Sequence, residues 1–267
     1  MDFLRRSLAP ISPEAWEQID EEARRVLELN LAARRLVDFN GPHGWKTSSV
    51  SLGRTERIKT GPSDGVRAEA RRVVPLMEMR VDFRLSLDDL YDMERGASDP
   101  DLDPVVKAAQ QMAQAEDTVI FNGYKAGSVT GILPASPHKP LTISTDYTEY
   151  PRTVEQAMET LRAAGVNGPY AVGLGSRCYA GLMQATEGGY PVFERLKLVL
   201  DGPIVRAPAI DGAVVMSTRG GDFELTVGQD LSVGFSHYDN SDVHLYLIES
   251  LTYRNIAPEA AVPLRYA

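Results

Sequence analysis

Residues 211–256 have the sequence DGAVVMSTRGGDFELTVGQDLSVGFSHYDNSDVHLYLIESLTYRNI, and this stretch decides the fold. Apolar and polar residues alternate along most of it, which is the period of a strand with one buried face. The Gly220-Gly221 pair supplies the positive φ angles of a tight turn, so residues 214–216 and 223–227 are expected to form a hairpin. The polar run at 239–242 predicts a second turn. The stretch is therefore expected to be a chain of strands, and it contains no catalytic motif.

Helices are expected before these strands, so the sequence predicts an α+β class. Ser12 followed by Pro13 is typical of a helix start, and apolar residues at steps of three and four predict a helix from there to about Val37. A second long helix is expected from Asp103 to Asn122, where an Asn-Gly pair ends it. Between residues 153 and 200, capped apolar stripes predict shorter helices around a strand at 170–174.

Residues 41–74 contain glycine, proline and interleaved charges instead of a long apolar period. An irregular segment of this length is uncommon inside a compact domain unless it is functional or bound elsewhere. This part of the chain is therefore expected to be a long extended arm.

Composition narrows the class of protein. The chain has 267 residues, a size at which one core tends to divide into lobes, and its net charge of −9 argues against broad binding to nucleic acid or anionic membranes. No apolar run approaches the ~18–20 residues of a membrane span, and the first residues lack the features of a secretory signal. Cys178 is the single cysteine, which excludes an intramolecular disulfide. We expect a soluble cytoplasmic protein with neither nucleic acid nor membrane as a partner.

One serine lies in a pattern typical of hydrolases. Residues 61–65, Gly-Pro-Ser-Asp-Gly, match the G-x-S-x-G motif, in which a strained strand-to-helix turn exposes the serine. The residues before the motif are not a buried strand, and no capped helix follows. A polar loop tip is the better interpretation, and a serine hydrolase at Ser63 stays as a distant alternative.

Other candidate sites are weaker still. The four histidines, at 43, 138, 237 and 244, are too dispersed for a metal motif, although His237 and His244 could approach across the last hairpin. Glu116 and Asp117 are adjacent on a helix and point about 100° apart, so they are expected to be salt-bridge partners or interface contacts rather than a catalytic pair. No catalytic residue and no metal ligand is predicted.

Three strings near the end of the chain resemble the carboxy-terminal signature of the encapsulins: residues 219–223, 228–235 and 249–253. Shorter matching strings follow the same order along nearly the whole chain, at residues 1–6, 9–10, 41–45, 94–96, 115–117, 168–170 and 189–191. The resemblance implies an α+β fold of the tailed-phage major capsid protein type. Its implied parts are a peripheral domain with an amino-terminal helix at 1–44, an extended loop at 45–72, the spine helix of the peripheral domain at 73–125, an axial domain at 126–227, and carboxy-terminal strands of the peripheral domain at 228–267.

The resemblance also implies a function. Encapsulins are self-assembling shell proteins, so the chain is expected to be a structural protein and not an enzyme, with sixty copies meeting around five-fold, three-fold and two-fold axes. The shell would enclose a cargo enzyme, a peroxidase or a ferritin-like iron protein, held by its terminal targeting peptide. A phage or prophage major capsid protein of the same fold is the nearer alternative.

Two sites follow from the resemblance alone. The positions matching the cargo-peptide patch are Val26, Leu27, Arg34, Asp38, Asp230, Leu231 and Val233. The positions matching the loop that lines the five-fold pore are Thr186, Glu187, Gly188, Gly189 and Tyr190, where five copies of Glu187 would form an acidic ring that favours cations. Leu87 stands where flavin binding is attributed to an aromatic residue in the family, so neither flavin nor another cofactor is expected.

Overall fold

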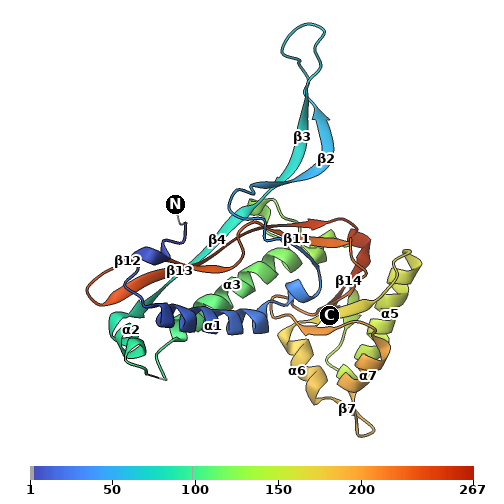
Figure 1. The fold of residues 1–267 in the computed structure, drawn as a ribbon. Helices are drawn as coiled ribbons and strands as arrows, with labels where there is room; N and C mark the ends of the chain where they lie inside the picture. Colours follow the sequence, from blue (N-terminus) through green and yellow to red (C-terminus); the bar gives the residue numbers. More distant parts are fainter. Residues whose placement is uncertain (1–2, 98) are drawn as a thin grey trace.

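The structure is a computed structural model that describes residues 3–97 and 99–267 (Figure 1). Its α-helices are α1 (Pro13–Asn30), α2 (Leu87–Glu94), α3 (Asp103–Asn122), α4 (Ile132–Ala135), α5 (Tyr150–Ala163), α6 (Ser176–Gln184) and α7 (Val192–Val199). Its strands are β1 (Asp38–Asn40), β2 (Ser49–Arg57), β3 (Glu69–Pro75), β4 (Met77–Ser86), β5 (Leu141–Ile143), β6 (Tyr170–Leu174), β7 (Thr186–Glu187), β8 (Tyr190–Pro191), β9 (Ile204–Arg206), β10 (Ala213–Ser217), β11 (Phe223–Val227), β12 (Ser232–Tyr238), β13 (Asp242–Asn255) and β14 (Ala261–Tyr266). The predicted mixture of helices and strands is confirmed.

The first sheet is built around β13, which pairs antiparallel with β11, β12 and β4. The short strand β1 adds to β11 in parallel, so the far end of the sheet comes from the segment that follows α1. Helices α1 and α3 lie together along this sheet (Figure 1). The expected second turn at 239–242 is confirmed as the tip of the β12–β13 hairpin.

The second sheet has the order β5-β14-β10-β6-β9 and lies with α5, α6 and α7. The expected boundary between the axial and peripheral domains, at residues 227 and 228, does not separate the strands of the two sheets. β11 belongs to the first sheet because residues 223–227 pair with β13, and β14 belongs to the second because residues 261–264 pair with β10. The last strand of the chain therefore ties the two sheets together.

The prediction that the strands on either side of Gly220-Gly221 pair with each other is wrong. Both glycines adopt the expected positive φ, 86° and 82°, and the chain turns there. The flanking strands then diverge, since β10 pairs with β6 and β14 while β11 pairs with β1 and β13. A local turn signal fixes the change of direction, whereas burial between distant segments fixes which strands pair.

The helices follow the predicted periods with shifted ends. α1 begins as expected, with Ser12 Oγ accepting from the Ala15 N–H at 3.2 Å, but it ends at Asn30 instead of Val37, and a 3₁₀ turn (Ala33–Arg35) follows. α5 begins at Tyr150, so residue 153, where the first of the shorter helices was expected to start, lies inside the helix. The prediction is wrong there because Pro151 already supplies a helix start one turn earlier.

The core of the described residues forms two clusters. One cluster lies around the second sheet and its helices and extends to the end of α3 and to β11, and its large members include Phe121, Tyr150 and Phe223. The other lies between α1, α2, α3 and the first sheet, and its members include Trp16, Met112 and Phe235. Strands β2 and β3 belong to neither cluster, because they pair only with each other and form an arm that projects away from both sheets (Figure 1).

Candidate functional site

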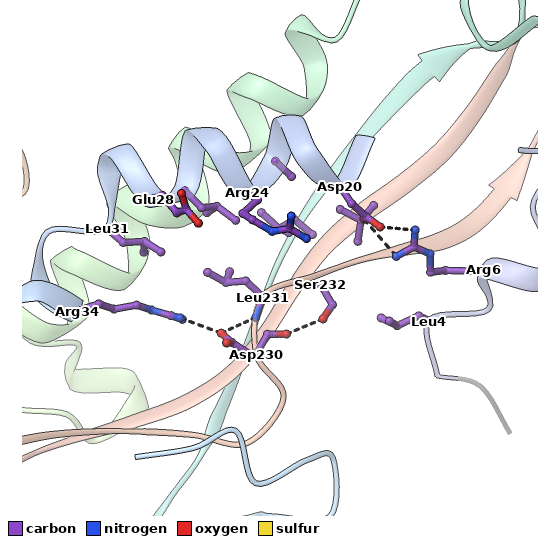
Figure 2. A pocket seen from close by; sticks show the side chains of 14 residues that line it. Leu4, Arg6, Asp20, Arg24, Glu28, Leu31, Arg34, Asp230, Leu231 and Ser232 are labelled. Atoms are coloured by element: carbon purple, nitrogen blue, oxygen red, sulfur yellow. Dashed lines mark hydrogen bonds and ion pairs between the residues drawn. The ribbon is translucent and has the colours of Figure 1, made fainter. Parts of the chain in front are cut away.

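A groove of about 460 Å³ runs between α1 and the beginning of β12 (Figure 2). We call it the α1–β12 groove. Its lining residues are Leu4, Arg6, Asp20, Ala23, Arg24, Leu27, Glu28, Leu31, Arg34, Asp230, Leu231, Ser232, Val233 and Leu247. Apolar side chains form its centre and charged side chains its ends and rim, so it suits a short chain segment with apolar side chains.

The helical period explains why α1 contributes one wall. Asp20, Ala23, Leu27 and Leu31 follow one another at steps of three and four, so they share a face of the helix. The opposite wall begins where Asp230 accepts the N–H of Leu231 at 2.9 Å, which fixes the turn that leads into β12. In Figure 2, Leu231 lies below α1 and faces it across the groove.

Ion pairs occupy both ends of the groove. At one end Arg6 donates to Asp20 at 2.7 Å, and its guanidinium lies over the ring of Trp16. At the other end Arg34 donates to Asp230 at 2.9 Å (Figure 2). The beginning of the chain forms part of the first end, because the Leu4 carbonyl accepts from the N–H of Phe235 on β12 at 2.8 Å.

Two fully buried carboxylates also hold Arg34. It donates to Glu116 of α3 at 2.7 Å and to Glu249 of β13 at 2.5 Å. Burial opposes the charge on Arg34, but hydrogen bonding and attraction to Glu116 outweigh it, so the pKa of Arg34 lies above its usual value. The guanidinium is therefore a fixed cation whose N–H groups donate to carboxylates of the same chain.

Two carboxyl groups beside this cation are disfavoured as anions. Burial, reinforced by the nearby Glu116, raises the pKa of Glu249 well above its usual value, and Glu249 Oε2 lacks a hydrogen-bond partner among the described residues. Burial likewise raises the pKa of Asp117 to about 7, although the N–H groups of Ala33 and Ala32 donate to it and lower the pKa. Glu116 is thus the expected salt-bridge partner, while Asp117 binds backbone amides instead.

The structure brings together five of the seven positions that match the cargo-peptide patch. Leu27, Arg34, Asp230, Leu231 and Val233 line the α1–β12 groove. Val26 is buried in the second core cluster instead of lining the groove. Asp38 lies outside the lining, and its carboxylate accepts the Gly221 N–H at 2.6 Å.

Sequence reasoning missed four charged residues of the groove: Arg6, Asp20, Arg24 and Glu28. Asp20 is polar and lies off the core face of its helix, so its residue type alone indicates only a solvated position. The signal that could have found these residues was their spacing, since Asp20, Arg24 and Glu28 are four residues apart and share a face with Leu27 and Leu31.

The positions that match the pore loop form a small exposed hairpin. Glu187 of β7 is opposite Tyr190 of β8, and Gly188 and Gly189 make the turn with φ of 58° and 83°. This hairpin is the tip that β7 marks in Figure 1. Glu187 forms an ion pair with Arg195 of α7, so its charge is balanced within the same chain.

The structure does not support a catalytic or metal site at the weaker candidate positions among the described residues. Ser63 is exposed at the tip of the arm, between two strands instead of at a strand-to-helix turn. His237 and His244 do meet across the β12–β13 hairpin, with stacked rings 4.2 Å apart. Within residues 3–97 and 99–267, no group of three or more His, Cys, Asp or Glu could hold a metal ion, and no helix is long and apolar enough to cross a membrane.

Comparisons with known proteins agree with this architecture. The family model described as "encapsulating protein for peroxidase" matches residues 1–252. A type 1 encapsulin shell protein of Rhodospirillum rubrum is 49% identical over 271 residues, covering 99% of this chain and 97% of the relative. A type 1 encapsulin shell protein of Mycobacterium tuberculosis is 44% identical over 266 residues, covering all of both chains.

Solved structures show the same fold at low identity. A virus-like particle from Pyrococcus furiosus matches with a TM-score of 0.67 and 19% identity, covering 93% of this chain and 98% of the other. Mycobacterium phage Bobi matches with a TM-score of 0.60 and 15% identity, covering 89% and 90%. These likenesses confirm the tailed-phage capsid fold, but the high identities are to encapsulin shell proteins and not to phage proteins. The role of the chain is therefore structural rather than enzymatic, and the chain belongs to the encapsulin family of self-assembling nanocompartment shell proteins.

Proposed function

We propose that sixty copies of the chain close into an icosahedral shell in the cytoplasm, and that the α1–β12 groove of each copy holds a targeting peptide at the terminus of a cargo enzyme. One observation carries the cargo site: an open groove of about 460 Å³ lies between α1 and β12 with an apolar centre and a charged rim. Leu27, Leu231 and Val233 offer aliphatic contact for apolar peptide side chains.

The length of the groove sets the size of its occupant. The α1 face from Asp20 to Leu31 spans roughly 16 Å at 1.5 Å per residue, which equals about five residues of extended chain. A contact of this size is weak alone. Many copies of the groove would act together on an oligomeric cargo, because each further contact is intramolecular.

The cargo we propose is a peroxidase or a ferritin-like iron protein. The description of the matching family model names a peroxidase, which supports the first of these. The shell itself would hold no resident cofactor, since Leu87 offers no aromatic surface for a flavin. Small molecules and ions would enter through pores lined by the β7–β8 hairpin.

Electron microscopy of the purified protein tests the assembly. Uniform closed shells with the dimensions of a sixty-copy particle are expected, and a species of one to a few subunits would contradict the proposal. Co-expression with a fluorescent reporter that ends in a candidate cargo terminus tests the groove, with the ratio of reporter to shell protein as the readout.

Leu231→Asp is the variant that tests the groove itself. Leu231 is partly exposed, so an aspartate there is expected to leave assembly intact and to abolish loading. Leu27→Asp is less informative, because Leu27 is buried in the second core cluster and its loss would damage the fold. Leu29→Asp is the matched control, since Leu29 lies on the same helix, is 70% exposed and does not line the groove. Loading that survives Leu231→Asp would place the cargo site elsewhere.

A further inference from the structure

Two side chains of opposite charge on the rim of the α1–β12 groove have no ion-pair partner among the described residues. Arg24 and Glu28 line the groove and are exposed, and neither has an ion pair or a side-chain hydrogen bond with any residue that the structure describes. Figure 2 shows both on the α1 side, above Leu231. The charges at the two ends differ from them, because Arg6 is paired with Asp20 and Arg34 with Asp230 and two buried carboxylates.

Their order along the helix explains why they do not pair with each other. A cation four residues before an anion is the less favourable orientation for an ion pair on a helix. The two side chains therefore remain available to an occupant of the groove. The N–H groups of Arg34, by contrast, donate to three carboxylates of its own chain, so few of them are left for an occupant of the groove.

Their spacing fits an extended chain. Four residues of α-helix rise about 6 Å, while two residues of an extended peptide span about 6.6 Å. Residues i and i+2 of an extended peptide point to the same side, so one could meet Arg24 and the other Glu28. The residues between and beside them would point to the opposite side, toward Leu231 and Val233.

The backbone of the other wall is bonded within the chain. β12 is the outer strand on its side of the first sheet, and its outer edge bonds the beginning of the chain where the Phe235 N–H donates to Leu4. Beside the groove, the Leu231 N–H is taken by the carboxylate of Asp230 instead of by a strand. These edge donors are therefore engaged within the chain, and side chains of the groove are what an occupant meets.

We infer that the α1–β12 groove selects peptides by charge order: it binds an extended segment in which an acidic and a basic residue, separated by one residue, alternate with apolar residues. The acidic residue meets Arg24 and the basic residue meets Glu28. This inference rests on the proposed cargo role of the groove and names the chemistry of the peptide that it takes. Arg24 and Glu28 are then determinants of specificity, and the apolar centre supplies the sequence-independent part of the affinity.

The test uses the full chain and two reporters in competition. Two fluorescent proteins of different colour are co-expressed with the shell protein, and each ends in a five-residue segment with leucine at alternate positions. One segment has glutamate before lysine at the two remaining positions, and the other has lysine before glutamate. The ratio of the two colours inside purified shells is measured.

The wild-type shell is expected to favour one charge order by about fivefold, since two exposed charge contacts act together. Neutralising both charges, with Arg24→Gln and Glu28→Gln, is expected to abolish the preference. The double replacement keeps the net charge and uses a good helix former at both positions, so assembly should persist. Glu21→Gln with Arg35→Gln is the matched control, because both residues are exposed, lack an ion pair among the described residues and do not line the groove.

The outcomes separate the inference from the proposal on which it rests. Equal loading of both reporters, or an unchanged preference after Arg24 and Glu28 are neutralised, would overturn the charge-order inference and leave the cargo groove standing. Reporters that fail to load with either charge order, and also with serine at both positions, would overturn the cargo role together with the inference. Loss of the preference in the control with Glu21→Gln and Arg35→Gln would show that charges outside the groove decide the preference, which also overturns the inference.

Discussion

Arg34 Nη2 donates to the carboxylate of Glu249 at 2.5 Å, although the two residues are 215 positions apart in the sequence. The same guanidinium contacts Glu116 of α3 and Asp230 before β12. One side chain thus joins the segment after α1 to α3, to β13 and to the turn before β12. Because these elements form both walls of the α1–β12 groove, the contact also sets the distance between the walls.

Arg34→Ala is expected to destabilise the chain by about 3–5 kcal/mol, because it leaves Glu116 and Glu249 buried without their cation. The measurement is urea unfolding at fixed protein concentration, followed by the fluorescence of Trp16 and Trp45. Arg35→Ala is the control, since Arg35 is exposed and lacks an ion pair among the described residues. Equal unfolding midpoints for the two variants would show that Arg34 is only a surface contact.

The pH dependence of stability should reveal the buried carboxyl of Asp117. Its pKa is about 7 in the folded protein against 3.8 for an ordinary aspartate, so the folded chain binds this proton more tightly than the unfolded chain. The stabilisation is complete below about pH 4 and is lost as pH rises to about 7. Each unit of pKa difference corresponds to about 1.4 kcal/mol.

Asp117→Asn removes this titration. The free energy of unfolding of the wild-type chain minus that of the variant is therefore expected to fall by a few kcal/mol from pH 4 to pH 7. Urea unfolding at several pH values measures it, with Asp64→Asn at the exposed tip of the arm as the control. A difference that stays constant with pH would show that Asp117 is ionised throughout.

Local chemistry made several elements predictable from the sequence. Ser12-Pro13 predicted the start of α1 because a side-chain oxygen and a proline satisfy the free amides of that turn. The alternation in residues 231–235 and 243–247 predicted β12 and part of β13, since Val233, Phe235, Val243, Leu245 and Leu247 are buried in the same core cluster. Five positions of the groove followed from the family resemblance, which records contacts between distant segments that periodicity does not.

The remainder depends on contacts that no local pattern encodes. Gly220-Gly221 predicted a turn correctly, but the partners of β10 and β11 depend on β14 and β13. Val26 and Leu27 are adjacent and equally apolar, and only the packing of α1 on α3 decides that one is behind the groove and the other in its lining. The pairing of Glu187 with Arg195 is similar, because the two residues meet only once α7 folds back beside the β7–β8 hairpin.

The ion pair between Glu187 and Arg195 changes the prediction for the proposed pore. A ring of Glu187 alone would favour cations, but Arg195 balances that charge within each chain. Arg195→Gln is therefore expected to expose the acidic ring and to speed the entry of cations severalfold. Quenching of an enclosed green fluorescent reporter by Cu²⁺ and by iodide measures entry of each sign of charge.

Lys197→Gln is the matched control for the pore. Lys197 lies on the same helix as Arg195, but it is paired with Glu194 instead of Glu187. Its replacement by glutamine removes one positive charge, as Arg195→Gln does. Only Arg195→Gln should raise the ratio of Cu²⁺ to iodide quenching. Equal ratios in the two variants would mean that Glu187 does not face the path of the ions.

The β2–β3 arm has little to hold it within one chain. Its strands pair only with each other, and its apolar residues Ile58, Val66 and Val73 are about half exposed. An isolated two-stranded hairpin is marginally stable in water. The arm therefore requires a surface outside its own subunit, and in a shell that surface belongs to a neighbouring copy.

Replacing residues 50–74 with a short Gly-Ser linker is expected to preserve the two cores and to prevent closure of the shell. The cores should survive because no side chain between these positions belongs to either buried cluster. Size exclusion and electron microscopy measure assembly, while far-ultraviolet circular dichroism checks that the shortened chain still folds. Ser63→Ala keeps the arm and should assemble normally. Closed shells built from the shortened chain would show that copies meet through the two sheet-bearing bodies alone, and that the arm has another role.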